Sequence, residues 1–87
     1  MKIKDGFAKR NIAGSDIAVP IGKKAKEFNG MITLNGTGAF LWDCFTKDIT
    51  TNEAVKMLLD EYEVDEITAK RDVEAFAKML KDNGIAE

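Results

Sequence analysis

The stretch MITLNGTGAFLWDCF, residues 31–45, changes its pattern in the middle and decides how the chain is organised. Residues 31–34 have the composition of a short β-strand, whereas residues 40–45 are almost continuously apolar and include the only tryptophan. The sequence Asn-Gly-Thr-Gly between them leaves no room for a long loop. Because Asn35 is a favourable N-cap residue, we predict a strand that leads directly into a buried helix.

Two further strands are predicted before this junction. Residues 7–12 and 17–21 are short runs of β-forming side chains, and Ala-Gly-Ser-Asp at 13–16 separates them as the turn of a hairpin. Residues 22–30, GKKAKEFNG, are polar and begin and end with glycine, which is typical of a loop. The third strand, residues 31–34, follows this loop.

The faces of these strands can be predicted from their alternation. The second strand carries three β-branched residues at every other position, the pattern of a half-buried strand: Ile17, Val19 and Ile21. Pro20 cannot donate a ladder hydrogen bond, so we expect it at a strand end or facing outward. In the third strand, Ile32 and Leu34 are expected to point inward.

Three helices are predicted after the junction. The first is apolar on most sides and should be central. The second begins with a capping box, Thr50 to Glu53, and the third is capped by Asp65 and ends near Asn83, with Ile85 folding back on its end. The inward stripe of the third helix is Ala69, Val73, Phe76, Ala77 and Leu80. Strands followed by helices indicate a single α+β domain, residues 1–87, with its helices on one face of a small sheet.

Composition limits the class of protein. The 87 residues have a net charge of −2, but residues 1–35 carry seven basic and three acidic side chains, whereas residues 36–87 carry six and twelve. This asymmetry indicates either a partner-binding face or two ordinary solvated surfaces. No signal peptide or membrane-spanning run is visible, and the single cysteine, Cys44, excludes an internal disulfide. We therefore expect a cytoplasmic protein that does not contact a membrane.

The side chains needed for catalysis are missing. Without histidine, the chain has no imidazole base and no histidine metal ligand. Cys44 lies in the most apolar predicted helix, so we interpret it as a packed thiol rather than a nucleophile. The Gly-Thr-Gly at 36–38 lacks the spacing of phosphate-binding loops. We expect no catalytic residue, no metal site and no cofactor.

DNA binding through a winged helix-turn-helix is a second function class that a small sheet with three helices allows. The helix that enters the groove should then be basic. Residues 66–82 contain four basic and four acidic side chains, and acidic residues follow the second helix. The charge therefore does not favour nucleic acid as a partner.

The ordered segments LNGTGAFLWDCF, TTNEAVKMLLDEYEVDE and AKRDVEAFAKMLKDNGI, together with IAVPIG at 17–22, resemble the PqqD-like family. The resemblance runs from Phe7 to Ile85 and departs from the family at Gly36, where a glutamate is expected. It implies a small winged-helix-like domain, three strands then three helices, that recognises precursor peptides. Such domains hold the leader of a ribosomally made peptide and present it to a modifying enzyme, often a radical S-adenosylmethionine enzyme. The sequence does not assign the pathway to pyrroloquinoline quinone or to another product.

The resemblance also implies a site. The leader adds as a strand to the third β-strand and lies between it and the third helix, so main-chain bonds give affinity and side pockets give specificity. The strand side of this site is Gly30, Met31, Ile32, Thr33 and Leu34. On the helix we favour the flank with Ile67, Lys70, Arg71 and Glu74, because Ile67 has no partner in the apolar stripe. The opposite flank, with Thr68, Asp72 and Met79, is the alternative.

Other interpretations stay open at this point. The favoured flank of the third helix has the composition of an ordinary solvated surface. For the whole chain, the alternative to a peptide-binding module is a winged-helix DNA-binding domain or a structural adaptor.

Overall fold

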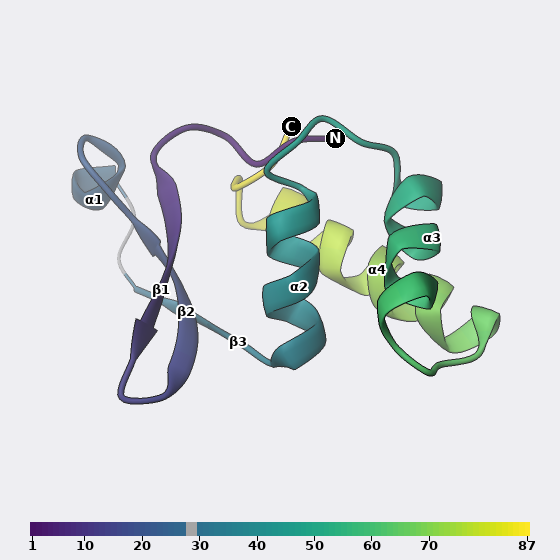
Figure 1. The fold of residues 1–87 in the computed structure, drawn as a ribbon. Coiled ribbons are helices and arrows are strands. Elements are labelled where there is room, and N and C mark those ends of the chain that lie inside the picture. Colours follow the sequence, from purple (N-terminus) through teal and green to yellow (C-terminus); the bar gives the residue numbers. More distant parts are fainter. Residues whose placement is uncertain (28–29) are drawn as a thin grey trace.

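A three-stranded sheet lies at one end of the molecule and three longer helices lie at the other, as Figure 1 shows for the computed structural model. The structure describes residues 1–27 and 30–87. The strands are β1 (Phe7–Ile12), β2 (Ser15–Pro20) and β3 (Ile32–Leu34), and the helices are α1 (Lys24–Glu27), α2 (Gly36–Cys44), α3 (Thr51–Glu61) and α4 (Glu66–Asp82). The expected α+β class is confirmed.

β1 and β2 form a hairpin with a two-residue loop. Ala13 and Gly14 both have positive φ, 52° and 85°, as the two central residues of a type I′ turn require. This turn is shorter than the predicted 13–16 segment, so β2 begins at Ser15 rather than at Ile17. The sheet order is β1-β2-β3, with both strand pairs antiparallel, so β1 and β3 are the edge strands of the sheet that the described residues form.

The predicted loop before β3 contains a helix that the sequence analysis missed. Lys24–Glu27 forms the four-residue helix α1, none of whose residues is buried. Such a helix has no apolar stripe by which it could be recognised in the sequence. Residues 28–29 of the predicted loop lie outside the described residues.

The helices cover the face of the sheet that carries Ala18, Ile32 and Leu34. Ala18 pairs with Ile32 in the register between β2 and β3, and Ala18 and Leu34 are buried. Ile17 and Val19 share a face as predicted, but it is the opposite face, and both are only half-buried. The inward orientation of Ile32 and Leu34 is confirmed, because both belong to or pack against the core.

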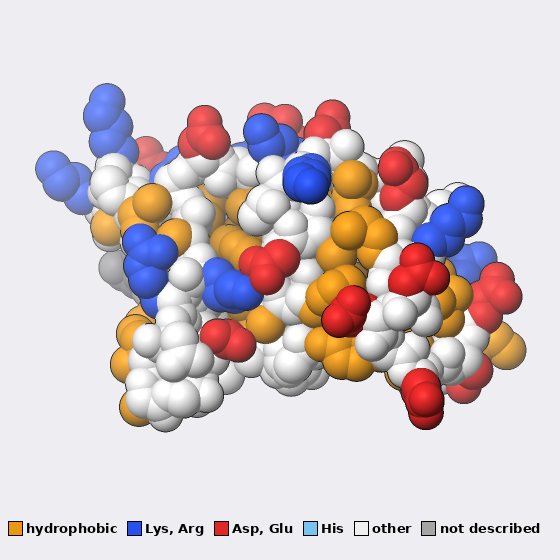
Figure 2. Space-filling model, in the orientation of Figure 1, with side chains coloured by type: hydrophobic (Ala, Val, Ile, Leu, Met, Phe, Trp, Pro, Cys, Tyr) orange, Lys and Arg blue, Asp and Glu red, His pale blue; other side chains and the backbone are white. Residues whose placement is uncertain are grey.

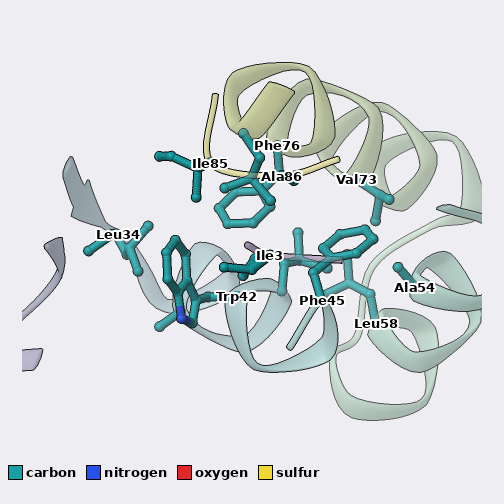
Figure 3. Packing of buried hydrophobic residues seen from close by; sticks show 14 of the residues in the cluster. Ile3, Leu34, Trp42, Phe45, Ala54, Leu58, Val73, Phe76, Ile85 and Ala86 are labelled. Carbon is teal, nitrogen blue, oxygen red and sulfur yellow. The ribbon is translucent and has the colours of Figure 1, made fainter. Parts of the chain in front are cut away.

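The core lies between the sheet, α2 and α4. Figure 3 shows Trp42 of α2 beside Leu34 of β3, with Ile85 and Phe76 on the other side. Trp42 is 2% exposed, and the predicted fold-back of Ile85 is confirmed at 3% exposed. The predicted inward stripe of α4 is also buried in full.

Residues before β1 complete the core in a way that the sequence analysis did not anticipate. Ile3 is buried and forms a bridge with Ala86, so the two ends of the chain lie side by side, as Figure 1 shows. The N–H of Ile3 donates to the carbonyl of Phe45 at 2.9 Å, and the N–H of Lys4 donates to the carbonyl of Ile85 at 2.8 Å. Through these hydrogen bonds, residues 3–4 connect the C-terminal end of α2 to the segment after α4.

All three predicted helix caps are present. The Asn35 side chain accepts a hydrogen bond from the N–H of Gly38 at 2.6 Å, and Asp65 accepts one from Thr68 at 2.7 Å. Thr50 and Glu53 form a complete capping box. Because Asn35 follows Leu34 directly, the cap fixes the direction in which β3 enters α2.

Candidate functional site

The free edge of β3 is the first part of the candidate site. The N–H of Ile21, one residue beyond β2, donates to the carbonyl of Gly6 before β1 at 2.8 Å. Hydrogen-bonding groups of successive strand residues alternate between the two sides. The groups of Val19 and Ile17 therefore also face β1, and those of Ala18 and Asp16 face β3. The two-residue hairpin loop agrees with this pattern, because its closing pair, Ile12 with Ser15, is then hydrogen-bonded.

This alternation fixes which groups of β3 point away from the sheet. Ala18 pairs with Ile32 and Asp16 pairs with Leu34, so the N–H and carbonyl of Ile32 and Leu34 are used within the sheet. Thr33 lies between them, and its N–H and carbonyl point to the free edge. Thr33 therefore offers one donor and one acceptor to an added strand.

Pro20 explains why the ladder between β2 and β3 is short. By the same alternation, its backbone nitrogen faces the β3 side, beyond the pairing of Ala18 with Ile32. Proline has no N–H, so the ladder cannot continue there. The structure confirms that Pro20 lies at the end of a strand.

Two cavities lie along β3, one at each end. The first, which we call the sheet cavity, has a volume of about 190 Å³ and is lined by Phe7, Ala18, Pro20, Gly30, Met31, Ile32, Asn83 and Ile85. The second, the helix cavity, has a volume of about 310 Å³ and is lined by Asn35, Thr37, Gly38, Leu41, Asp72, Ala75, Phe76 and Met79. Both volumes are at or below the lower end of ordinary small-molecule sites, so they suit side chains better than a cofactor.

α4 lines the helix cavity, and the residues that directly follow α4, Asn83 and Ile85, line the sheet cavity. A Cβ atom placed on Gly38 would lie 3.6 Å from the ring of Phe76 and 3.7 Å from Cβ of Leu34, so α4 and β3 approach each other at this point. Phe76, Met79 and Asn83 follow one another at helical spacing along this lining. The two cavities thus lie at the two ends of β3, and we use the word groove below for these two cavities together with the edge of β3 between them.

The structure brings only part of the predicted site together. Gly30, Met31 and Ile32 line the sheet cavity, Thr33 lies on the free edge and Leu34 is buried beneath it. The favoured α4 residues, Ile67, Lys70, Arg71 and Glu74, line neither cavity. At 100° per residue, Ile67, Lys70 and Glu74 fall on the far side of α4 from Met79, whereas Arg71 lies only about 80° from Met79. The Nε atom of Arg71 is 4.0 Å from Oδ1 of Asp72, which lines the helix cavity. Contact of the four favoured residues with a peptide stays a prediction.

The α4 residues that line the groove belong to the flank that the sequence analysis ranked second. Asp72 and Met79 were named there, whereas Ala75, Phe76 and Asn83 were not connected with a site. Met79 gave the one usable signal, because it is an apolar residue directly beside the core stripe. Phe76 was assigned to the core, which is correct for most of its surface, since it is 8% exposed.

The groove has little charge and no group suited to bond-making. Among the described residues that line the two cavities, only Asp72 is charged. No buried residue in the described chain is polar or charged, and no described cluster of His, Cys, Asp or Glu could hold a metal ion. Burial raises the pKa of the Cys44 thiol, and the nearby Asp43 carboxylate raises it further. The described lining of the two cavities is therefore mainly apolar or uncharged.

Comparisons with known proteins give a family and a fold. The family model described as "Coenzyme PQQ synthesis protein D (PqqD)" matches residues 18–86. One similar solved structure is "TbiB1 in Complex with the TbiA(beta) Leader Peptide", with a TM-score of 0.76, 23% identity and coverage of 100% of this chain and 95% of that chain. Another is "Lasso peptide synthetase B1 complexed with the leader peptide", with a TM-score of 0.76, 21% identity and coverage of 99% and 95%. No curated protein sequence matches the chain.

Proposed function

Because this chain belongs to the PqqD family, we propose that it binds the leader of a ribosomally made precursor peptide by strand addition at the free edge of β3. The observation that carries the proposal is the orientation of Thr33, whose N–H and carbonyl face outward between two side-chain cavities. The similar structures are described as complexes with leader peptides, and this supports a peptide as the ligand.

In our proposal the leader forms a fourth strand beside β3. Main-chain bonds to Thr33 supply affinity that does not depend on sequence, and side chains on one face of the leader enter the sheet and helix cavities. Phe76 and Met79 provide the apolar walls of the helix cavity. Asp72 makes the same cavity favourable for a leader with a basic side chain at that end.

We further propose that the protein is not catalytic and presents the bound peptide to a separate modifying enzyme. The uncharged interior and the apolar groove support the non-catalytic part. We propose a radical S-adenosylmethionine enzyme, or another peptide-modifying enzyme, as the partner, because the resemblance described in the sequence analysis implies one. Cys44 is buried as a free thiol, which fits our placement of the protein in the reducing cytoplasm. None of the described helices combines the length and apolar character that a membrane crossing requires.

The deciding experiment is a titration of the ¹⁵N-labelled chain with the synthetic leader of a precursor encoded beside its gene. We expect amide shifts at Met31 and Thr33 and along the Asp72–Met79–Asn83 flank of α4. Met79→Ser should weaken binding about tenfold, or about 1.4 kcal/mol, because it removes an apolar wall of the helix cavity. Ile67→Ser is the matched control, since Ile67 is 81% exposed and lines neither cavity.

Three outcomes would contradict the proposal. Shifts confined to residues away from β3 and α4 would place the peptide elsewhere. A larger loss from Ile67→Ser than from Met79→Ser would restore the flank that the sequence analysis favoured. Salt-dependent binding to arbitrary duplex DNA, with no response to the leader, would favour the winged-helix alternative.

A further inference from the structure

The face of the sheet that points away from the helices is a second candidate surface. We call it the outer face and define it by Arg10, Ile12, Ile17 and Val19, with Ala8 and Thr33 at its sides. In Figure 1, α2, α3 and α4 all lie on the other side of the sheet. Ile12 is 51% exposed, and Ile17 and Val19 are half-buried. The described residues thus leave an apolar stripe along β2 uncovered.

The charged side chains on the outer face and in α1 are mostly basic. Arg10 lies on the outer face beside Ile17, and Lys23 and Lys26 follow Ile21 in and next to α1. None of the described residues on the face is acidic, and Glu27 of α1 pairs with Lys24 at 3.3 Å. Figure 2 shows blue side chains over α1 and the sheet at this end of the molecule, with some red ones beside them.

The outer face is also continuous with the proposed peptide site. Thr33 pairs with Ile17, so its side chain lies on the outer face while its N–H and carbonyl point to the free edge. A strand added to β3 would place every second side chain on the same outer face. A partner seated there would contact β2 and the outward side chains of the bound peptide together.

From these observations we infer that the outer face docks the peptide-modifying enzyme, through an enzyme surface that is apolar at its centre and acidic at its rim. This inference rests on the proposed function, because it assumes that a peptide occupies the edge of β3. Charge complementarity selects the occupant. A second copy of the chain, packed face to face, would bring Arg10 and the α1 lysines of both copies together, which like-charge repulsion disfavours.

The test uses the full chain and two charge- and shape-matched double variants. Arg10→Glu with Ile12→Ser alters the outer face, where both side chains are exposed. Met57→Ser with Lys81→Glu makes a matching apolar-to-serine change and charge reversal at exposed sites on α3 and α4 that line neither cavity. Each protein is measured for binding to the synthetic leader by fluorescence anisotropy. Each is then measured for binding to the purified modifying enzyme encoded beside the precursor, with and without the leader.

We expect the outer-face variant to bind the leader as the wild type does, and to bind the enzyme roughly tenfold more weakly, with a smaller dependence on salt. The α3/α4 variant should bind both as the wild type does. Equal enzyme binding by all three proteins, or a stronger loss in the α3/α4 variant, would overturn the inference. So would a wild-type dimer that the outer-face variant dissociates. If the wild type does not bind the leader, the proposed function is contradicted. Failure of the proposed function and failure of this inference can therefore be told apart.

Discussion

Two glycines in the first turn of α2 have different surroundings, and this difference can be measured. A Cβ atom on Gly36 would meet no atom within 4 Å, whereas one on Gly38 would lie 3.0 Å from the Asn35 side-chain oxygen that caps the helix. Gly36→Ala should raise the free energy of unfolding by about 0.5–1 kcal/mol, because alanine loses less backbone entropy on folding. Urea denaturation followed by circular dichroism measures this gain.

Gly38→Ala is the matched control for that prediction. The added methyl group must displace the capping oxygen of Asn35, which accepts the N–H of Gly38 at 2.6 Å. The gain in helix propensity is then offset by a weaker cap. We expect no increase in stability, or a decrease, and an equal gain from both substitutions would contradict this account of the junction.

Asp65 gives the stability of α4 a dependence on pH. Its pKa lies below the usual value, first because the Thr68 N–H donates to its carboxylate and then because the Thr68 hydroxyl does so. Because the pKa of Asp65 is lower in the folded state than in the unfolded state, where it is about 3.9, the cap stabilises the fold at pH values above about 3.9. This contribution disappears as the pH falls through the pKa of Asp65 in the folded state.

Asp65→Asn tests this linkage, because asparagine caps a helix without titrating. Between about pH 5 and pH 3, the wild type should lose more stability than the variant, as measured by the urea midpoint at each pH. Asp65→Ala should be less stable than both at neutral pH, because it removes the acceptor for Thr68. Parallel pH profiles for the wild type and Asp65→Asn would show that the cap does not contribute to the acid response.

The two edge strands of the sheet differ in their readiness to accept another strand. By the same alternation, the free edge of β1 presents the main-chain groups of Lys9, whose ammonium group pairs with Asp43 at 2.7 Å. Arg10 follows directly and donates to the Lys9 carbonyl at 3.3 Å. Charged side chains at the middle of an edge strand discourage pairing with other chains. β3 has no charged residue, so strand addition is directed to β3.

Proline substitutions in β3 test the assigned orientation of its hydrogen bonds. Thr33→Pro removes an N–H that faces the free edge, whereas Ile32→Pro removes one that faces Ala18. We expect Thr33→Pro to keep its helical circular-dichroism signal and to bind the leader more weakly by about 1–3 kcal/mol. Ile32→Pro should mainly destabilise the domain. If both variants unfold, or if Thr33→Pro binds the leader normally, strand addition at this edge is wrong.

The sequence predicted those elements whose signals are local. Caps at Asn35, Thr50 and Asp65 and the apolar stripe of α4 depend on residues within a few positions of one another, so they could be recognised directly. The covered face of β2 could not, because Ile17 and Val19 are more apolar than Ala18, and only the packing of α2 decides which face is inside. The sequence could not rank the two flanks of α4 for the same reason, since the rotation of α4 against β3 is a tertiary property.

On the scale of the whole molecule, the sheet and the helices depend on one shared core. Leu34 from β3, Ile85 from the end of the chain and Ile3 from its beginning all join the same cluster of buried residues as Trp42. In Figure 3, Trp42 lies where these segments meet. A domain of 87 residues has a stability of only about 5–15 kcal/mol, so one large side chain at this position carries much of it.

Trp42→Ala should therefore lower the free energy of unfolding by about 3–5 kcal/mol, the usual cost of removing a large buried aromatic ring. Urea denaturation followed by far-ultraviolet circular dichroism measures this loss without relying on the missing fluorophore. Met57→Ala is the control, since Met57 is 38% exposed on α3 and should cost less than about 1 kcal/mol. A Trp42→Ala protein that unfolds at the wild-type urea concentration but no longer binds the leader would place Trp42 in the peptide site. Trp42 and Leu34 belong to the same buried cluster, and Leu34 lies next to Thr33 in β3. We therefore expect Trp42→Ala to unfold at a lower urea concentration than the wild type. Any loss of leader binding should follow from this loss of structure at the edge of β3.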